Sequence, residues 1–263
     1  MEKNKRIIVS LTSFPAAIDY AITAVKSIIN GSVLPDKLIL YLTYNQFDNK
    51  EIPQELKELA RRNPIFEIRD YPEDIRSYRK LIPALIDFPE DIIVTIDDDV
   101  NYHRDMLKQL LQFHKQYPED IIAHRAKKIC PELPYKKWKK YRWYHFLTKK
   151  IHKNPLIMQT GVAGVLYPPR SLKAEMLDPN LFTQIAPTTD DIWFWGAAIA
   201  NGRKIIPVPF GKNKPKGLKK PKEISLKTVN FKTGIDNNSK ALNDILSAYP
   251  ELKEKIFDNF AKK

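Results

Sequence analysis

Short apolar runs alternate with longer amphipathic segments along the first half of the chain. Runs rich in β-branched residues predict strands at Ile7 to Leu11, Leu38 to Leu42, Phe66 to Ile68 and Asp91 to Ile96. Apolar residues at helical spacing predict helices at Ala16 to Ile29, Gln54 to Arg62, Tyr78 to Leu85 and Arg104 to Tyr117. This alternation is typical of βαβ units, so we predict an α/β fold with a mainly parallel sheet.

The second half of the chain is less regular. We expect a loop and strand at Gly161 to Pro169, a strand at Ile205 to Val208, and helices at Asp190 to Ala200, Ser239 to Ala248 and Glu251 to Phe260. Between them, Lys212 to Lys222 contains six lysines, two prolines and one glycine, a composition that predicts a mobile loop. We therefore divide the chain into a catalytic domain, 1–210, and a basic loop with a helical tail, 211–263.

Composition narrows the function only a little. The 263 residues suffice for one α/β domain, and a net charge of +13 favours anionic partners such as phosphorylated substrates, anionic lipid or nucleic acid. One cysteine, Cys130, excludes an intrachain disulfide, and we find neither a secretion signal nor an apolar run long enough to span a membrane. A cytoplasmic protein, with a peripheral position on the inner face of the membrane as an alternative, is the resulting expectation.

Three consecutive carboxylates, Asp97, Asp98 and Asp99, follow the Asp91 to Ile96 strand. Open α/β sheets bind ligands beyond the carboxyl ends of their strands, and clustered carboxylates need a cation or strong hydrogen bonds to offset their repulsion. In an extended stretch Asp97 and Asp99 point to one side, so these two are the candidate ligands of Mn²⁺ or Mg²⁺. A solvated acidic turn that caps the next helix is the alternative.

Two further clusters bear polar groups at predicted helix starts. Thr189 precedes Asp190 and Asp191, so these carboxylates are either helix caps or candidates for a general base. The cluster that includes Arg79 and Lys80 precedes the acidic strand, where cations could meet a diphosphate or form a solvated helix face.

Taken in order, these motifs resemble a known family. The segments that carry the resemblance are Ile8 to Pro15, Ser77 to Leu85, Thr95 to Asp99, Gly161 to Pro169 and Asp190 to Trp195. Over residues 6–210 the chain is similar to bacterial GT-A glycosyltransferases of the family-two-like kind, which build capsules and lipopolysaccharides. The resemblance implies a Rossmann-like, nucleotide-binding GT-A fold.

The resemblance also implies roles for individual residues. Asp97 and Asp99 match the DXD metal motif, with Asp97 and Asp98 also facing the nucleotide, and Asp191 matches the base, with Asp190 as its rival. The predicted nucleotide-sugar contacts are Ser10, Thr12, Phe14, Pro15, Arg79 and Lys80. Gly161 and Gly164 are expected on the acceptor side. Trp193 and Trp195 are typical of a core, and stacking of at least one of them on an acceptor sugar is the alternative. The family usually has an acidic residue after its second strand, where this chain has Leu42-Thr43-Tyr44-Asn45, and Asp70 or Asp74 could substitute for it.

A basic, aromatic segment, Tyr135 to Lys153, contains no acidic residue. Its interleaved rings and cations suit a lipid interface or lipid-linked acceptor, a nucleic-acid strand, or a packed core whose lysines reach out to solvent. The sequence leaves these alternatives open.

These features lead to one functional hypothesis and two rivals. The hypothesis is a metal-dependent, inverting transferase that moves a hexose from a UDP-sugar to a saccharide or lipid-linked glycan in surface polysaccharide synthesis. The rivals are a metal-dependent nuclease or nucleotidyltransferase, and a non-catalytic basic module that binds a membrane or nucleic acid. Nucleic acid is the least expected partner.

Overall fold

The computed structural model describes residues 5–47, 51–141, 156–211, 213–221 and 236–261, with side chains up to residue 256. Seven strands form the central sheet in the order β10-β6-β9-β4-β1-β2-β3. They are β1 (Ile7–Thr12), β2 (Lys37–Leu42), β3 (Phe66–Asp70), β4 (Ile92–Thr95), β6 (Ile121–Ala123), β9 (Val165–Tyr167) and β10 (Ile205–Pro207). All neighbouring strands pair in parallel except β9, which is antiparallel to both β4 and β6. The predicted α/β fold with a mainly parallel sheet is confirmed.

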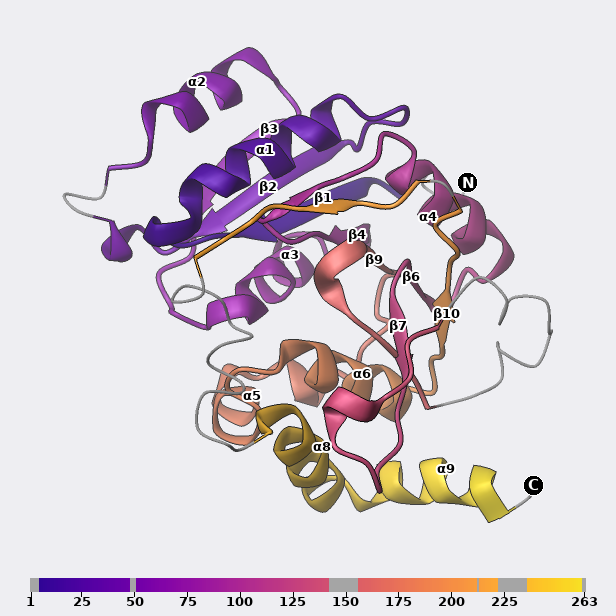
Figure 1. The fold of residues 1–263 in the computed structure, drawn as a ribbon. Helices are drawn as coiled ribbons and strands as arrows, with labels where there is room; N and C mark the ends of the chain where they lie inside the picture. The colour runs from indigo at the N-terminus through magenta and orange to yellow at the C-terminus, as the bar shows by residue number, and fades with distance from the viewer. Residues whose placement is uncertain (1–4, 48–50, 142–155, 212, 222–235, 262–263) are drawn as a thin grey trace.

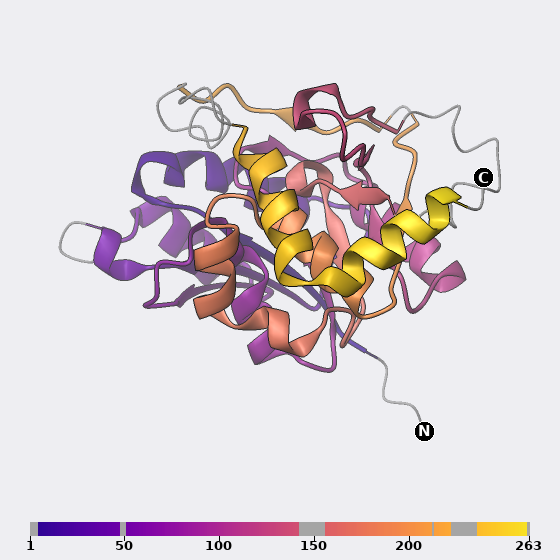
Figure 2. The same ribbon diagram turned by 90° about the horizontal axis from the view of Figure 1, so that it is seen from below.

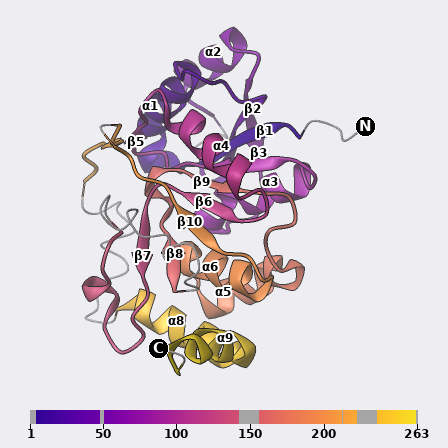
Figure 3. The ribbon, with the colours of Figure 1, turned by 90° about the vertical axis from the view of Figure 1, so that its right-hand side faces the viewer.

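Helices cover both faces of the sheet (Figures 1 and 3). One face packs against α1 (Ile18–Ile29), α2 (Gln54–Arg62) and α4 (Met106–Gln116). The other face packs against α3 (Ile82–Asp87) and α6 (Asp190–Ala200). Outside α6 lie α5 (Pro179–Ile185), α8 (Asn237–Ala248) and α9 (Pro250–Ala261), of which α8 and α9 are nearest the viewer in Figure 2.

The side-chain alternation along the strands explains why both faces are apolar. In β1, Ile8 joins the core beneath α3 and α6, whereas Val9 and Leu11 join the core beneath α1 and α4. A strand buried on both faces reads as a continuous apolar run, which is the pattern that predicted β1, β2 and β4 from sequence.

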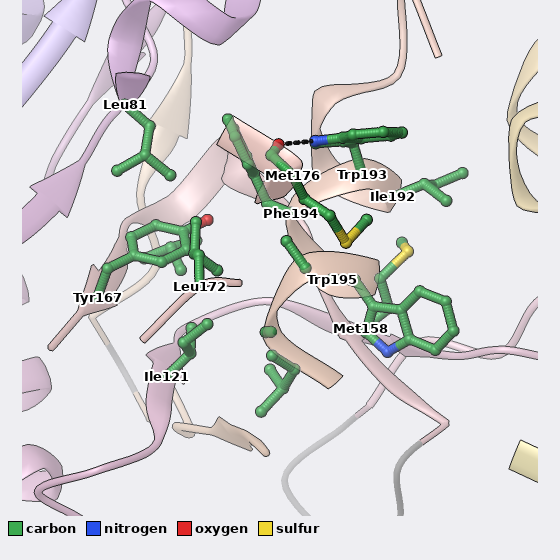
Figure 4. Close-up of a cluster of buried hydrophobic side chains, with 14 of the residues drawn as sticks. Leu81, Ile121, Met158, Tyr167, Leu172, Met176, Ile192, Trp193, Phe194 and Trp195 are labelled. Carbon is green, nitrogen blue, oxygen red and sulfur yellow. Dashed lines mark hydrogen bonds between the residues drawn. The ribbon is translucent and has the colours of Figure 1, made fainter. Parts of the chain in front are cut away.

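The larger core is built around α6 and is rich in aromatic rings (Figure 4). Tyr78 stacks on Phe182 with ring centroids 4.0 Å apart, and Phe182 meets the edge of Trp193 at 6.3 Å. The Trp193 indole N–H donates to the Met176 carbonyl at 2.7 Å. This packing fixes α6 and therefore the carboxylates at its first turn.

One local prediction needs correction, and a second gains structural detail. The helix expected over Tyr78 to Leu85 is a 3₁₀ turn, Arg76–Lys80, followed by α3 from Ile82, because Pro83 lacks an N–H and fits only a helix's first turn. Within Lys212 to Lys222, expected as a mobile loop, residues 213–221 form a strap that contains a short strand and crosses in front of the central strands (orange in Figure 1), while its mobility stays a prediction. Its β11 (Lys216–Gly217) pairs antiparallel with β5 (Val100–Asn101).

The basic, aromatic segment lies partly outside the described residues, since residues 142–155 are not described. In its described part Trp138 is buried, and the Tyr135 N–H donates to Asp236 and Ser239 at the start of α8. In the chain the segment lies between β7 (Ala126–Lys128) and β8 (Ile157–Gln159), which pair as a two-stranded antiparallel sheet. Among described residues, no helix is long and apolar enough to cross a membrane. The division into 1–210 and 211–263 stays a prediction.

Candidate active site

Five segments meet at the carboxyl ends of the central strands. Two are the turn that follows β1 and the 3₁₀ turn Arg76–Lys80. The others are the acidic turn Asp97 to Asp99 after β4, the 3₁₀ turn Gly161–Ala163 before β9, and the first turn of α6. Because β9 is antiparallel, its beginning lies at the same sheet edge as the end of β4. Residues far apart in sequence thus share one edge.

Lys80 is the centre of this cluster. Its ammonium lies 3.0 Å from Asp97 Oδ1 and 3.0 Å from Asp190 Oδ2, with only 9% of the side chain exposed. Burial alone would lower the pKa of Lys80, but Asp190 and Asp97 raise it well above its ordinary value. Lys80 is therefore a buried cation that ties the acidic turn to the start of α6.

Asp191 lies beside this ion network. Its Oδ1 accepts a hydrogen bond from the Gly161 backbone N–H at 2.9 Å. Burial, and then the negative charge of Asp190, raise the pKa of the Asp191 carboxyl to about 7, against the opposing effect of Lys80. Such a carboxylate can accept a proton near neutral pH, which a general base requires.

Gly161 occupies the point at which these side chains converge. A Cβ atom at this position would lie 2.7 Å from Lys80 Nζ, 3.2 Å from Asp191 Oδ1 and 3.4 Å from Asp97 Oδ1. Only glycine fits without displacing the charged groups. Gly164, three residues on, has φ of +95°, a conformation that also favours glycine.

Asp98 and Asp99, the other two carboxylates of the acidic turn, are both paired with Lys220, which the sequence did not predict. Asp98 is 8% exposed, accepts from Ser13 Oγ at 2.5 Å, and lies 2.7 Å from Lys220 Nζ. The same ammonium lies 3.4 Å from Asp99 Oδ2. Alternation along a strand does not pair Asp97 with Asp99, because Asp98 and Asp99 form a turn rather than an extended strand.

A divalent metal would meet an incomplete set of ligands here. Among described residues, no group of three or more His, Cys, Asp or Glu side chains could hold one. The acidic turn already gathers a cation, since the Lys220 ammonium lies within 3.4 Å of both Asp98 and Asp99. Mg²⁺ and Mn²⁺ sites commonly take one or two carboxylates and complete their shell with water and phosphate, so these residues fit such an ion.

The Arg79 side chain makes hydrogen bonds within the fold. Its guanidinium donates to Thr12 Oγ1 at 2.8 Å, to the Ser13 carbonyl at 3.0 Å, and to Thr43 Oγ1. Arg79 thereby joins the ends of β1 and β2, and burial lowers its pKa. Asp70, at the end of β3, accepts the Tyr44 N–H at 3.0 Å, so it lies beside the end of β2 where the family's acidic residue was missing.

The other predicted contacts differ in exposure. Ser10 is fully buried within β1, whereas Phe14 is partly exposed and Pro15 is exposed. Pro15 lines an open hollow of about 520 Å³ beside the ends of β1 and β2, shared with Gln46 and Phe47. Trp193 and Trp195 have no exposed surface, and such burial speaks against their stacking on an acceptor sugar (Figure 4).

Three site residues escaped the sequence analysis. Ser13 and Lys220 contact Asp98, and Ser77 Oγ donates to Asp190 Oδ1 at 2.9 Å. Ser13 and Ser77 lie within the motifs Ile8 to Pro15 and Ser77 to Leu85, but no sequence pattern marks either hydroxyl as a partner of a distant carboxylate. Lys220 is one lysine of a run, and nothing in the run distinguishes it.

No known family profile matches the chain, and no curated protein matches it in sequence. Among solved structures, the fold is similar to that of a mannosyltransferase, PcManGT from Pyrobaculum calidifontis, in complex with GDP-Man and Mn²⁺. The TM-score is 0.52 at 16% identity, over 79% of this chain and 56% of that one. A 4-diphosphocytidyl-2C-methyl-D-erythritol synthase gives a TM-score of 0.49 at 9% identity, over 84% of this chain and 96% of that one. At such identities the first likeness concerns the fold alone, and it shows a GT-A-like α/β fold.

Proposed function

We propose that the chain is a glycosyltransferase that uses a nucleotide-sugar donor. The observation that carries the proposal is the convergence of Asp97, Lys80 and Asp191 around Gly161 at the carboxyl edge of the sheet. This arrangement places a carboxylate of raised pKa beside an acidic turn suited to a cation. A GT-A-like fold, similar to that of a structure holding GDP-Man and Mn²⁺, supports the same conclusion.

The residues divide the chemistry between them. Asp191 accepts the proton of an acceptor hydroxyl as that oxygen forms its bond to the anomeric carbon of the sugar. The bond from the anomeric carbon to the diphosphate oxygen breaks, and its electron pair leaves with the nucleotide. Lys80 holds Asp190 and Asp97 in place and balances the charge that three neighbouring carboxylates would otherwise concentrate there.

Asp97 and Asp99 would hold a divalent ion, Mn²⁺ or Mg²⁺, which when bound neutralises the charge that builds on the leaving diphosphate. Their side chains are 25% and 35% exposed, more than Asp98, whose carboxylate is anchored by Ser13. Asp98 therefore supports the turn, while its two neighbours are the more exposed carboxylates. Arg79 and Thr12 fix the ends of β1 and β2 on which the nucleotide would rest.

The finer assignments are proposals that follow the family resemblance. We propose a UDP-hexose donor, inversion at the anomeric carbon, and a saccharide or lipid-linked glycan acceptor in capsule or lipopolysaccharide synthesis. Phe14, Pro15 and Asp70 lie beside the ends of the first three strands and are the nucleotide contacts we favour. We propose that Gly161 and Gly164 shape the acceptor side. The basic, aromatic segment Tyr135 to Lys153 is our candidate for contact with an anionic membrane surface.

The deciding experiment is a screen of nucleotide-sugars with Mn²⁺, with release of the nucleoside diphosphate measured by chromatography. We expect turnover with one UDP-sugar, its loss when EDTA removes the metal, and recovery when Mn²⁺ is restored. Asp244→Asn, a substitution on the exposed face of α8, serves as the matched control for Asp191→Asn. Pyrophosphate release from a nucleoside triphosphate, with no nucleotide-sugar consumed, would instead identify a nucleotidyltransferase.

A further inference from the structure

Lys220 reaches the acidic turn from a part of the chain that the proposed chemistry does not use. Its ammonium lies 2.7 Å from Asp98 Oδ1 and 3.4 Å from Asp99 Oδ2, with 11% of the side chain exposed. It also lies 5.6 Å from the centre of the Tyr20 ring. Burial alone would lower the pKa of Lys220, but Asp98 and Asp99 raise it, so the group is held as a cation.

Lys220 belongs to the strap 213–221, and the backbone of this strap is hydrogen-bonded to the acidic turn. The Leu218 N–H donates to the Asp99 carbonyl at 2.7 Å, and Lys216–Gly217 pairs with Val100–Asn101. Lys216 and Gly217 are exposed, so little apolar surface holds this part of the strap down. A segment held by a few hydrogen bonds and by the ion pairs of one lysine can open at low cost in free energy.

A divalent ion at Asp99 would compete with the Lys220 ammonium for the same carboxylate. Mg²⁺ and Mn²⁺ take carboxylate oxygens at about 2 Å, much closer than an ammonium does, and two cations in one small site repel each other. Lys220 already contacts Asp99, the more exposed carboxylate of the proposed metal pair. An ion that binds Asp99 must therefore meet or displace Lys220.

We propose that Lys220 is an internal counter-ion that occupies the cation position of the acidic turn, and that a divalent metal displaces it together with the strap 213–221. The proposal rests on the metal site of the proposed function. It adds a competitor from the protein's own chain. Metal loading and release of the strap become one event, so the strap is closed when the metal is absent and open when it is bound.

The first test measures binding of Mn²⁺ alone, by the loss of the paramagnetic resonance signal of the unbound ion. The proteins are the wild type, Lys220→Met, Lys220→Arg, and the matched control Lys219→Met, which removes an equal charge from an exposed neighbour. We expect Lys220→Met to bind Mn²⁺ about tenfold more tightly than wild type, because no ammonium then competes with the ion for Asp99. Lys220→Arg and Lys219→Met should stay near wild type.

The second test needs no substitution. Hydrogen exchange of the Leu218 amide, which is bonded to the Asp99 carbonyl, should speed up when Mn²⁺ is added to the wild-type protein. Unchanged or weaker Mn²⁺ binding by Lys220→Met, no Mn²⁺ binding by any of the proteins, or an equally protected Leu218 amide would each overturn the proposal. Neither readout involves sugar transfer, so a failure of the transferase proposal would be seen separately.

Discussion

Gly161 and Asp191 are joined by a hydrogen bond of 2.9 Å from the backbone N–H of the glycine to the carboxylate. The bond links the turn before β9 to the first turn of α6, and it leaves the second carboxylate oxygen of Asp191 for other partners. The same glycine borders Lys80 and Asp97. The geometry of the candidate site can therefore be tested at both ends of this one bond.

Asp191→Asn should lower turnover by at least about a hundredfold, because the amide cannot accept the acceptor's proton. Binding of UDP with Mn²⁺ should change little, since the substitution preserves the size of the side chain. The measurements are steady-state kinetics and a nucleotide titration. A variant that keeps wild-type turnover would exclude Asp191 as the base.

Gly161→Ala should disturb the site without unfolding the protein. The new Cβ would lie 2.7 Å from Lys80 Nζ and 3.2 Å from Asp191 Oδ1, so the ion network must shift. We expect a fall in kcat of about tenfold or more, because small misplacements of catalytic groups are costly. Gly217→Ala, where an added Cβ meets no atom within 4 Å, should have the activity of wild type.

Phe182→Ala should cost about 3 to 5 kcal/mol of unfolding free energy, because it removes a fully buried ring that stacks on Tyr78 and meets Trp193. Urea denaturation followed by tryptophan fluorescence measures the loss. Leu34→Ala is the control, since Leu34 is 52% exposed and should change stability by less than about 0.5 kcal/mol. Equal effects of the two substitutions would contradict the described core.

His124 should make folding stability depend on pH. Its ring is 4% exposed, stacks on Phe210 at 5.1 Å, and burial lowers its pKa to about 4. The folded state therefore favours the neutral ring, while the unfolded chain takes up a proton below its ordinary pKa of about 6.5. Stability from this residue is complete above that value and is lost as the pH falls toward 4.

Between pH 7 and pH 5 the loss due to His124 should be about 2 kcal/mol. His124→Gln does not titrate, so its unfolding free energy should fall by less over the same interval. Because Asp191 has a raised pKa and contributes with the opposite sign, only the difference between the two proteins is informative. Parallel pH profiles would show that His124 is protonated equally in both states.

The fold was readable from the sequence because its strands are buried on both faces. Continuous apolar runs marked β1, β2 and β4, and the helix over Asp190 to Ala200 has the predicted bounds. The start of α3 near Pro83 was harder to predict. A helix tolerates proline in its first turn, but the sequence does not show which residues form that turn. Trp193 and Trp195 illustrate the ambiguity of aromatic residues, whose burial depends on how α5, α8 and α9 pack around α6.

The site was readable in its composition but not in its contacts. Position at a strand end identified the acidic turn, and position at a helix start identified Asp190 and Asp191. Periodicity could not show that Asp98 and Asp99 form a turn, nor that Lys80 lies between two carboxylates 93 positions apart, at 97 and 190. The lysine-rich composition around Lys220 correctly excluded a core, but a strap needs only backbone pairing and one buried charge.

The reversed direction of β9 brings the chain back to the carboxyl edge of the sheet. The chain leaves that edge after β6, at Ala123, and returns to it at Gly161, just before β9. The last part of the stretch before Gly161 is tied to α6, because Ile157 and Met158 lie in its core and the Gln159 side-chain N–H donates to the Asp191 carbonyl. One short stretch of chain therefore braces the first turn of α6 and then places Gly161 among the charged groups of the same edge.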